Sequence, residues 1–190
     1  MGYYAEHYPE ESGKIIEELN LALHSIDPGS IERLADEIWK ADQVFFVGVG
    51  RVLLALQCVA KRLAHLGVKA HYVGEITEPA FTEQDLLIVG SGSGNSIFPF
   101  AIAKKAKAIG AKVIHIGSNP ESGMKELADF MVRIPVRTKL YLEDEIDSVQ
   151  PMTSLFEQSV LLLGDTVAKM IVEKHGLDMK ELWKYHANLE

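Results

Sequence analysis

The stretch LLIVGSGSGNS (residues 86–96) decides the fold of this chain. Its first four residues are apolar and two of them are β-branched, which is typical of a strand buried on both faces. A run of small residues follows, and residues 97–109 have the pattern of a helix. Gly92 and Gly94 allow a tight turn close to a ligand, and free amides ahead of a helix N-terminus bind anions. We therefore expect a phosphate site in this loop; the alternative is a turn that only links strand to helix.

This loop belongs to a regular alternation of strands and helices. Five short apolar segments are predicted to be strands: residues 43–49, 69–73, 85–90, 112–117 and 130–135. Strands that alternate with helices run parallel and are joined by right-handed crossovers. The pattern therefore predicts an α/β fold, a three-layer α/β/α sandwich around a five-stranded parallel sheet. Ligands bind at the carboxyl edge of such a sheet, where four unusual loops gather: residues 48–51, 74–75, 91–96 and 118–119.

Composition limits the compartment and the partners. The chain has 190 residues, of which 47% are hydrophobic, enough for one domain with a full core. Its net charge of −8 argues against a nucleic-acid partner, which favours a basic surface. The single cysteine, Cys58, excludes an internal disulfide and fits a reducing compartment. The longest apolar stretch, residues 160–170, is interrupted by charges and is too short to span a bilayer. We expect a soluble, cytoplasmic protein without membrane contact.

The single predicted domain, residues 1–190, has four parts. They are N-terminal helices (residues 1–41), an α/β core (42–135), an exposed loop (136–150), and C-terminal helices with a tail (151–190). Ser30 is the expected cap of the second helix. The acidic loop is expected to be mobile, and a lid would have the same composition. Residues 160–163 are apolar on every side of their helix, which predicts a homo-oligomer with this helix near the interface.

A second glycine-rich loop begins at Gly48. It starts like a dinucleotide-binding fingerprint, but Leu53 stands where the third glycine belongs, so a nucleotide is the weaker interpretation. Arg51 follows the loop, and a guanidinium beside hydroxyl groups suits a monophosphate or a sugar hydroxyl. Alternatively, Arg51 is a surface residue at a helix start. The lysine of a P-loop is missing, which favours a monophosphate over a nucleoside triphosphate.

Seven segments carry a resemblance to a known family, in the same order and over almost the whole chain. They are residues 48–51, 62–67, 73–75, 91–94, 118–122, 150–157 and 186–190. On these segments the chain resembles sugar isomerase (SIS) domains, and more narrowly the 6-phospho-3-hexuloisomerases. The Ser-Gly-Ser-Gly loop is common to SIS domains, whereas residues 150–157 and the tail 186–190 narrow the resemblance. It implies a flavodoxin-like fold of the nucleotide-binding type.

The resemblance also implies a reaction, the interconversion of D-arabino-hex-3-ulose 6-phosphate and fructose 6-phosphate, with no cofactor and no metal. Moving a carbonyl between adjacent carbons needs a base and donors for the developing oxyanion of an enediol. The resemblance makes Glu157 the candidate base, although residues 154–157 alone fit a capping box in which this carboxylate binds a backbone amide. It makes His65 and His186 candidates for ring opening or proton relay. Alternatively, His65 only ends a helix and His186 lies in a solvated tail.

The expected substrate contacts come from both glycine-rich loops: Gly50, Arg51, Ser91, Gly92, Ser93, Asn95 and Ser96. Two positions depart from the usual pattern of the family, because Val52 replaces a serine and Asn95 replaces a glutamate. Two further interpretations stay open, a non-catalytic SIS module that senses a phosphosugar and an isomerase of another phosphosugar, such as a pentose 5-phosphate. The expected partners are a small phosphosugar and further copies of the chain, as a dimer or a tetramer, with the tail reaching a neighbouring subunit's site.

Overall fold

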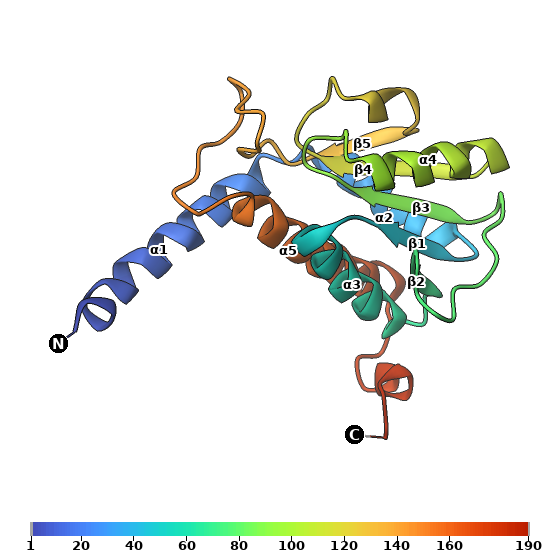
Figure 1. Cartoon of the computed structure of the whole chain (residues 1–190). Coiled ribbons are helices and arrows are strands. Elements are labelled where there is room, and N and C mark those ends of the chain that lie inside the picture. The colour runs from blue at the N-terminus through green and yellow to red at the C-terminus, as the bar shows by residue number, and fades with distance from the viewer. Residues whose placement is uncertain (1, 190) are drawn as a thin grey trace.

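The computed structural model describes residues 2–189, and its centre is a five-stranded parallel sheet (Figure 1). The strands lie in the order β2-β1-β3-β4-β5. Their bounds are β1 Val44–Val47, β2 Ala70–Tyr72, β3 Leu86–Gly90, β4 Lys112–Gly117 and β5 Phe130–Arg133. β1 and β3 are buried at every residue, as strands covered by helices on both faces must be. The predicted fold class is confirmed.

Helices cover both faces of the sheet. Their bounds are α1 Tyr3–His24, α2 Pro28–Lys40, α3 Gly50–Ala64, α4 Ile97–Ile109 and α5 Ser154–His175, with two 3₁₀ helices, η1 Gly123–Glu126 and η2 Glu181–Tyr185. Side chains of α2, α3 and α5 share one hydrophobic cluster with one face of the sheet, whereas those of α4 and η1 share a second cluster with the other face. Figure 1 shows α4 on the opposite side of the sheet from α3 and α5. The molecule therefore has three layers.

The order of the strands reverses between β1 and β3. The chain passes from β1 to β2 on one side and then places β3 on the other side, so Val44 pairs with both Ala70 and Leu86. In open parallel sheets this reversal leaves a crevice at the carboxyl ends of the two strands, and ligands bind there. The loops at residues 48–49 and 91–96 both leave the sheet at this point.

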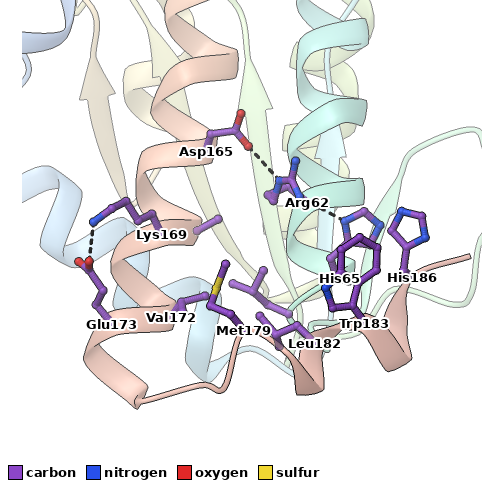
Figure 2. Close-up of a pocket in the computed structure, with 12 residues that line it drawn as sticks. Arg62, His65, Asp165, Lys169, Val172, Glu173, Met179, Leu182, Trp183 and His186 are labelled. Carbon is purple, nitrogen blue, oxygen red and sulfur yellow. Dashed lines mark hydrogen bonds and ion pairs between the residues drawn. The ribbon is translucent and has the colours of Figure 1, made fainter.

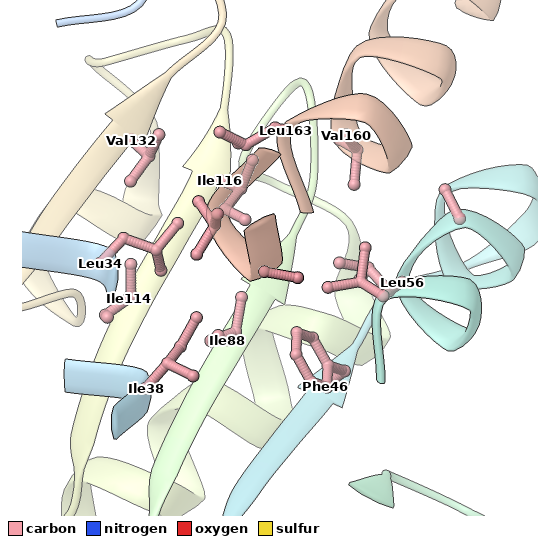
Figure 3. Close-up of a cluster of buried hydrophobic side chains, with 14 of the residues drawn as sticks. Leu34, Ile38, Phe46, Leu56, Ile88, Ile114, Ile116, Val132, Val160 and Leu163 are labelled. Carbon is pink, nitrogen blue, oxygen red and sulfur yellow. The ribbon is translucent and has the colours of Figure 1, made fainter. Parts of the chain in front are cut away.

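The larger hydrophobic core lies under α3 and α5 (Figure 3). Leu56 of α3 and Val160 of α5 point toward Phe46 of β1, and all three side chains are at most 1% exposed. Full burial of such a side chain contributes about 1.5–3 kcal/mol. The two helices approach closely at Gly164, because a Cβ there would lie 2.2 Å from Cγ2 of Val59. This packing holds α5 against α3, and the first turn of α5 carries Glu157.

The second helix is capped by a residue other than the one expected. The side chain of Asp27 accepts a hydrogen bond from the amide of Ser30 at 2.8 Å, and Pro28 is the first residue of α2. Both features are typical of a helix start. The prediction of Ser30 as the cap is therefore wrong by three positions, because Asp27 offers an acceptor one residue before the proline.

Residues 136–150 are irregular, as predicted, but several residues near both ends are buried. Val136 and Thr138 are buried near one end, and Ser148 and Gln150 are buried near the other. The carboxylate of Glu145 connects different parts of the segment. It accepts hydrogen bonds from four groups: Ser118 Oγ, Thr138 Oγ1 and the amides of Thr138 and Leu142. The expectation of an exposed loop therefore needs correction at both ends of the segment.

Glu18 of α1 holds the last residues of this segment. Its carboxylate accepts hydrogen bonds from Ser148 Oγ at 2.7 Å, the amide of Val149 at 2.6 Å and Gln150 Nε2 at 2.9 Å. Burial raises the pKa of Glu18, but these three hydrogen bonds and the charge of Arg137 outweigh burial and hold the pKa below its usual value. The first helix is thereby tied to the turn that precedes α5.

Parts of α1 and α5 face outward in the single chain. α1 extends away from the sheet toward the N-terminus (Figure 1), and its Tyr4 and Tyr8 are 87% and 72% exposed. On α5, Val160 and Leu163 face the core, whereas Leu162 is 37% exposed. The all-round burial expected for residues 160–163 is therefore not reached within one chain. None of the helices described is long and apolar enough to cross a bilayer.

Candidate active site

The loop after β3 folds back on its own first residue. Ser91 is 4% exposed, and its carbonyl and hydroxyl oxygens both accept from the amide of Gly94, at 3.1 and 3.2 Å. Gly94 has a φ of +68°, in the left-handed region, and a Cβ there would lie 2.0 Å from Ser122 Oγ. Glycine is therefore required at this position for its backbone and for its size.

Four amides of this loop find no acceptor within residues 2–189: those of Gly92, Ser93, Asn95 and Ser96. α4 begins directly after Ser96, and no side chain caps it. The hydroxyl of Ser91 donates to that of Ser96 at 3.3 Å, so both hydroxyls lie beside the free amides. Unpaired amides at a helix N-terminus form an anion site, which supports the interpretation of a phosphate-binding loop.

A buried histidine supports this loop from the neighbouring strand. His115 of β4 is 2% exposed, and its Nε2 lies 2.9 Å from the carbonyl oxygen of Ser91. Because a carbonyl only accepts, Nε2 carries the proton. Burial lowers the pKa of His115, and the hydrogen bond to Ser91 only partly opposes this, so the fold favours the neutral ring. Sequence reasoning missed His115; the signal was a polar residue in the otherwise apolar end of a strand.

Gly50 and Arg51 begin α3 on the other side of the crevice. Gly50 has a φ of +57°, and no side chain caps the helix. The N-termini of α3 and α4 therefore both point their free amides toward the carboxyl ends of β1 and β3. The backbone is tightly packed between them, since a Cβ on Gly90 would lie 2.9 Å from Cγ1 of Val52.

Glu157 lies in the first turn of α5 and reaches the start of α3. Its side chain is 10% exposed, whereas that of Arg51 is 65% exposed. Arg51 Nε donates to Oε2 of Glu157, and Thr153 Oγ1 donates to Oε1 at 2.9 Å. The carboxylate accepts from no backbone amide in the described chain, and the amide of Ser154 instead donates to the carbonyl of Pro151. The interpretation of Glu157 as half of a capping box is therefore wrong.

Arg51 and Phe156 connect the start of α5 with the loops after β1 and β3. Arg51 joins the loop after β1 to Glu157, and Phe156 packs on the loop after β3, its Cδ1 only 3.6 Å from where a Cβ of Gly92 would lie. A nearly buried carboxylate beside an anion site can remove a proton from a phosphorylated substrate held by that site.

His65 and His186 lie at the far end of α3. His65 directly follows the last residue of the helix, so about 20 Å of helix separates it from Arg51. The rings of the two histidines stack, with their centroids 5.0 Å apart. The structure therefore brings His65 and His186 together, as grouped in the sequence analysis, but within one chain it brings neither to Glu157.

The two histidines line a groove of about 620 Å³ between the C-terminal ends of α3 and α5 and the helix η2 (Figure 2). Arg62 crosses one side of it and pairs with Asp165 at 3.2 Å. Burial, together with the charges of Lys61 and Arg62, lowers the pKa of His65. Nε2 of His65 is buried and has no hydrogen-bond partner within residues 2–189. At this end, one buried ring nitrogen therefore lacks a partner in the described part of the chain.

The sequence profile of the SIS domain matches residues 37–162. The chain belongs to the SIS domain family. Among its relatives, the 3-hexulose-6-phosphate isomerase of Bacillus subtilis is 40% identical over 181 residues, which cover 95% of this chain and 98% of that protein. A protein of the same name from Methanocaldococcus jannaschii is 39% identical over 160 residues, 84% of this chain and 83% of that protein.

Solved structures of SIS proteins agree with this assignment. A crystal structure from Methanococcus jannaschii, from which a function of 3-hexulose-6-phosphate isomerase was inferred, has a TM-score of 0.81 at 35% identity and covers 95% of this chain and 99% of that one. An Escherichia coli protein in complex with A5P shares the fold, with a TM-score of 0.78 at 21% identity over 98% of this chain and 100% of that one. The SIS resemblance and the isomerase class predicted from the sequence are confirmed.

Two substituted positions of this SIS domain have visible roles. Val52 packs over Gly90, so a methyl group lies where a serine would place a hydroxyl near the loop. Asn95 is exposed, and its Oδ1 accepts from the amide of Gly123 at 3.0 Å, which ties the loop to η1. Within residues 2–189 no group of three or more His, Cys, Asp or Glu side chains could hold a metal ion. Glu190, the last residue of the SIS-like tail, lies outside the described residues.

Proposed function

We propose that this SIS protein interconverts D-arabino-hex-3-ulose 6-phosphate and fructose 6-phosphate, with Glu157 as the base. The observation that carries the proposal is the nearly buried carboxylate of Glu157, held by Arg51 and Thr153, next in sequence to Phe156, which packs on the loop with the free amides of residues 92–96. Relatives named for this reaction match the chain over nearly its whole length, which supports the choice of substrate.

The phosphate of the substrate binds in the loop after β3. The free amides of the loop, with the hydroxyls of Ser91, Ser93 and Ser96, offer several charge-assisted hydrogen bonds of about 1.5–3 kcal/mol each. Because the chain is acidic overall, these local donors must hold the anion without help from the net charge. Arg51 is exposed enough to turn from Glu157 toward the sugar.

The reaction then needs one base and no redox partner. Glu157 removes the proton from C2 of the 3-ketose, the electron pair of the C–H bond forms the C2–C3 double bond, and the π pair of the C3 carbonyl moves onto O3, which gives an enediolate. The hydroxyl proton on O2 then moves to O3, the O2 electron pair forms the C2 carbonyl, and the C2–C3 π pair takes the proton back from Glu157 at C3. The helix N-termini of α3 and α4 stabilise the negative charge that develops on the enediol oxygens.

His65 and His186 act from a neighbouring copy of the chain in this proposal. They are too far from Glu157 within one chain, yet the groove that they line is open and leaves Nε2 of His65 unpaired. A homo-oligomer, as a dimer or a tetramer, in which this groove faces the crevice of the next subunit would complete the site. We place the protein in the cytoplasm, where the exposed thiol of Cys58 stays reduced.

The test is turnover of chemically defined D-arabino-hex-3-ulose 6-phosphate, with fructose 6-phosphate measured in a coupled assay. Wild-type protein is expected to convert it, and unphosphorylated 3-hexulose is expected to be a far poorer substrate. Thermal-shift screening against other phosphosugars, including pentose 5-phosphates, identifies a different substrate if one is preferred. Binding that raises Tm without turnover of any sugar would contradict the proposal and favour a sensing module.

A further inference from the structure

Thr153 does not perform the usual task of a threonine at a helix start. It is the N-cap residue of α5, but its side chain accepts no hydrogen bond from the helix amides. Its hydroxyl instead donates to Oε1 of Glu157 at 2.9 Å. A structural cap at this position would accept from the backbone, so the contact serves the carboxylate rather than the helix.

The backbone before α5 aims this hydroxyl. Met152 has a φ of +58°, in the left-handed region that non-glycine residues rarely adopt, and its side chain is 90% exposed. Thr153 then has φ −110° and ψ 27° instead of the extended conformation usual for an N-cap. Such outliers persist where the surrounding structure demands them, often at active sites. Ser154 stabilises the turn at residues 151–154, because its hydroxyl donates to the carbonyl of Pro151 at 2.8 Å.

The two partners of Glu157 differ in how firmly they hold it. Arg51 reaches the carboxylate with a long side chain that is 65% exposed, whereas Thr153 is half-buried and has a short, β-branched side chain with few rotamers. Arg51 can therefore leave when a substrate enters, but Thr153 stays. Departure of Arg51 frees Oε2, while Oε1 remains bound to the hydroxyl.

We propose that Thr153 is the positioning residue for the base of this isomerase, an inference that rests on the proposed function. Its hydroxyl anchors Oε1, so that Oε2 alone carries the proton between the two adjacent carbons. One anchored and one free oxygen allow the small rotation that the transfer needs without loss of the carboxylate's orientation. Misplacing a catalytic group by about 1 Å can cost up to about a hundredfold in rate.

The experiment compares Thr153→Val, Thr153→Ser and Thr166→Val on the hexulose phosphate, with kcat, KM and the primary deuterium isotope effect measured for each. Thr166 is a matched control because it lies on the same helix, is exposed, and donates only to the carbonyl of Leu162. We expect Thr153→Val to lower kcat about 10- to 100-fold with KM changed less than about twofold, and to raise the isotope effect, because proton transfer becomes slower. Thr153→Ser should restore kcat to within about threefold, and Thr166→Val should match wild type.

Two results would overturn the inference: an unchanged kcat and isotope effect in Thr153→Val, or a Thr153→Ser variant as slow as the valine variant. If the valine variant does not fold, Thr153→Ala against Thr153→Ser provides the same comparison. If the wild-type protein converts the sugar and the Thr153 variants have the same kcat and isotope effect, only the positioning role of Thr153 is refuted. A wild-type protein that does not turn over the sugar removes the proposed function as well.

Discussion

The two ends of helix α3 differ in how many of their polar groups are paired within one chain. We call the start of α3 the completed end and its C-terminal end the open end. At its start, the chain alone supplies free loop amides, a supporting histidine and a carboxylate whose two oxygens are both bound. At its end, two stacked histidines line an open groove, and a buried ring nitrogen has no partner in the described chain. The comparison teaches that one chain builds the proposed phosphate loop and base, whereas the two histidines proposed for proton relay lie at a groove that one chain leaves open.

At the completed end, substitution of Glu157 is expected to lower activity most. Glu157→Gln removes the base but keeps the shape, so we expect kcat to fall about 10²- to 10⁴-fold with Tm changed by only a few degrees. Glu10→Gln is a suitable control, because Glu10 pairs with Lys14 on the exposed part of α1. Normal turnover by Glu157→Gln would remove this carboxylate from the mechanism.

The open end is tested by mixing subunits. His65→Ala should lower kcat about 10²-fold if this ring relays a proton. Refolding His65→Ala together with Glu157→Gln should restore activity to about one quarter of wild type in a dimer with shared sites, because mixed dimers regain one intact site. Gel filtration and turnover of the mixture are the measurements. A mixture no more active than its separate parts would place both groups in one chain or remove His65 from the reaction.

A methyl group added at Gly94 is expected to weaken substrate binding by the proposed phosphate loop. Gly94→Ala would force a φ of +68° on alanine and push Cβ to within 2.0 Å of Ser122 Oγ. We expect KM for the phosphosugar to rise about tenfold or more, and the free energy of unfolding to fall by about 1–3 kcal/mol. Gly13→Ala on α1 meets nothing within 4 Å and should raise stability by up to about 1 kcal/mol. Equal KM values for the two variants would contradict the assignment of the loop.

The smallest expected effect concerns pH, since each end holds a histidine whose pKa is lowered in the fold. Burial is the main cause for His115 and for His65. Between the folded pKa and the unfolded value of about 6.5, the unfolded chain binds more protons, so stability rises with pH there and is lost as pH falls. Tm should therefore decrease from pH 7 to pH 5, and less so in His115→Gln. An identical decrease in that variant would show that His115 does not contribute.

Patterns of neighbouring residues predicted the central strand and the tight loop after it. The apolar run before Gly90 and the small residues that follow were sufficient, because both features depend on local chemistry. Phosphate binding by this loop stays a prediction. The parallel sheet followed from the alternation of strands and helices. The cap of α2 was misplaced because Asp27 and Ser30 offer equivalent acceptors in sequence and only the fold selects one.

Contacts between distant residues were not predictable from one sequence. The pairing of Glu157 with Arg51 joins residues 106 positions apart, and the support of Ser91 by His115 depends on the pairing of β3 with β4. The whole segment 136–150 was predicted to be exposed because it is rich in acidic residues. Glu145, however, uses its carboxylate to bind groups of the loop itself. The separation of His65 from Glu157 likewise depends on the length of α3 rather than on any motif.

The clasp between Glu18 and residues 148–150 has a consequence for the order of assembly. Its partners are 130 to 132 positions apart, so during synthesis the first helix must wait until about four fifths of the polypeptide has emerged before it finds them. Strands β1, β3 and β4 can pair well before that moment. Glu157, the proposed base, is therefore set in place late, and an unfinished chain has the loop proposed to bind phosphate but not yet the carboxylate.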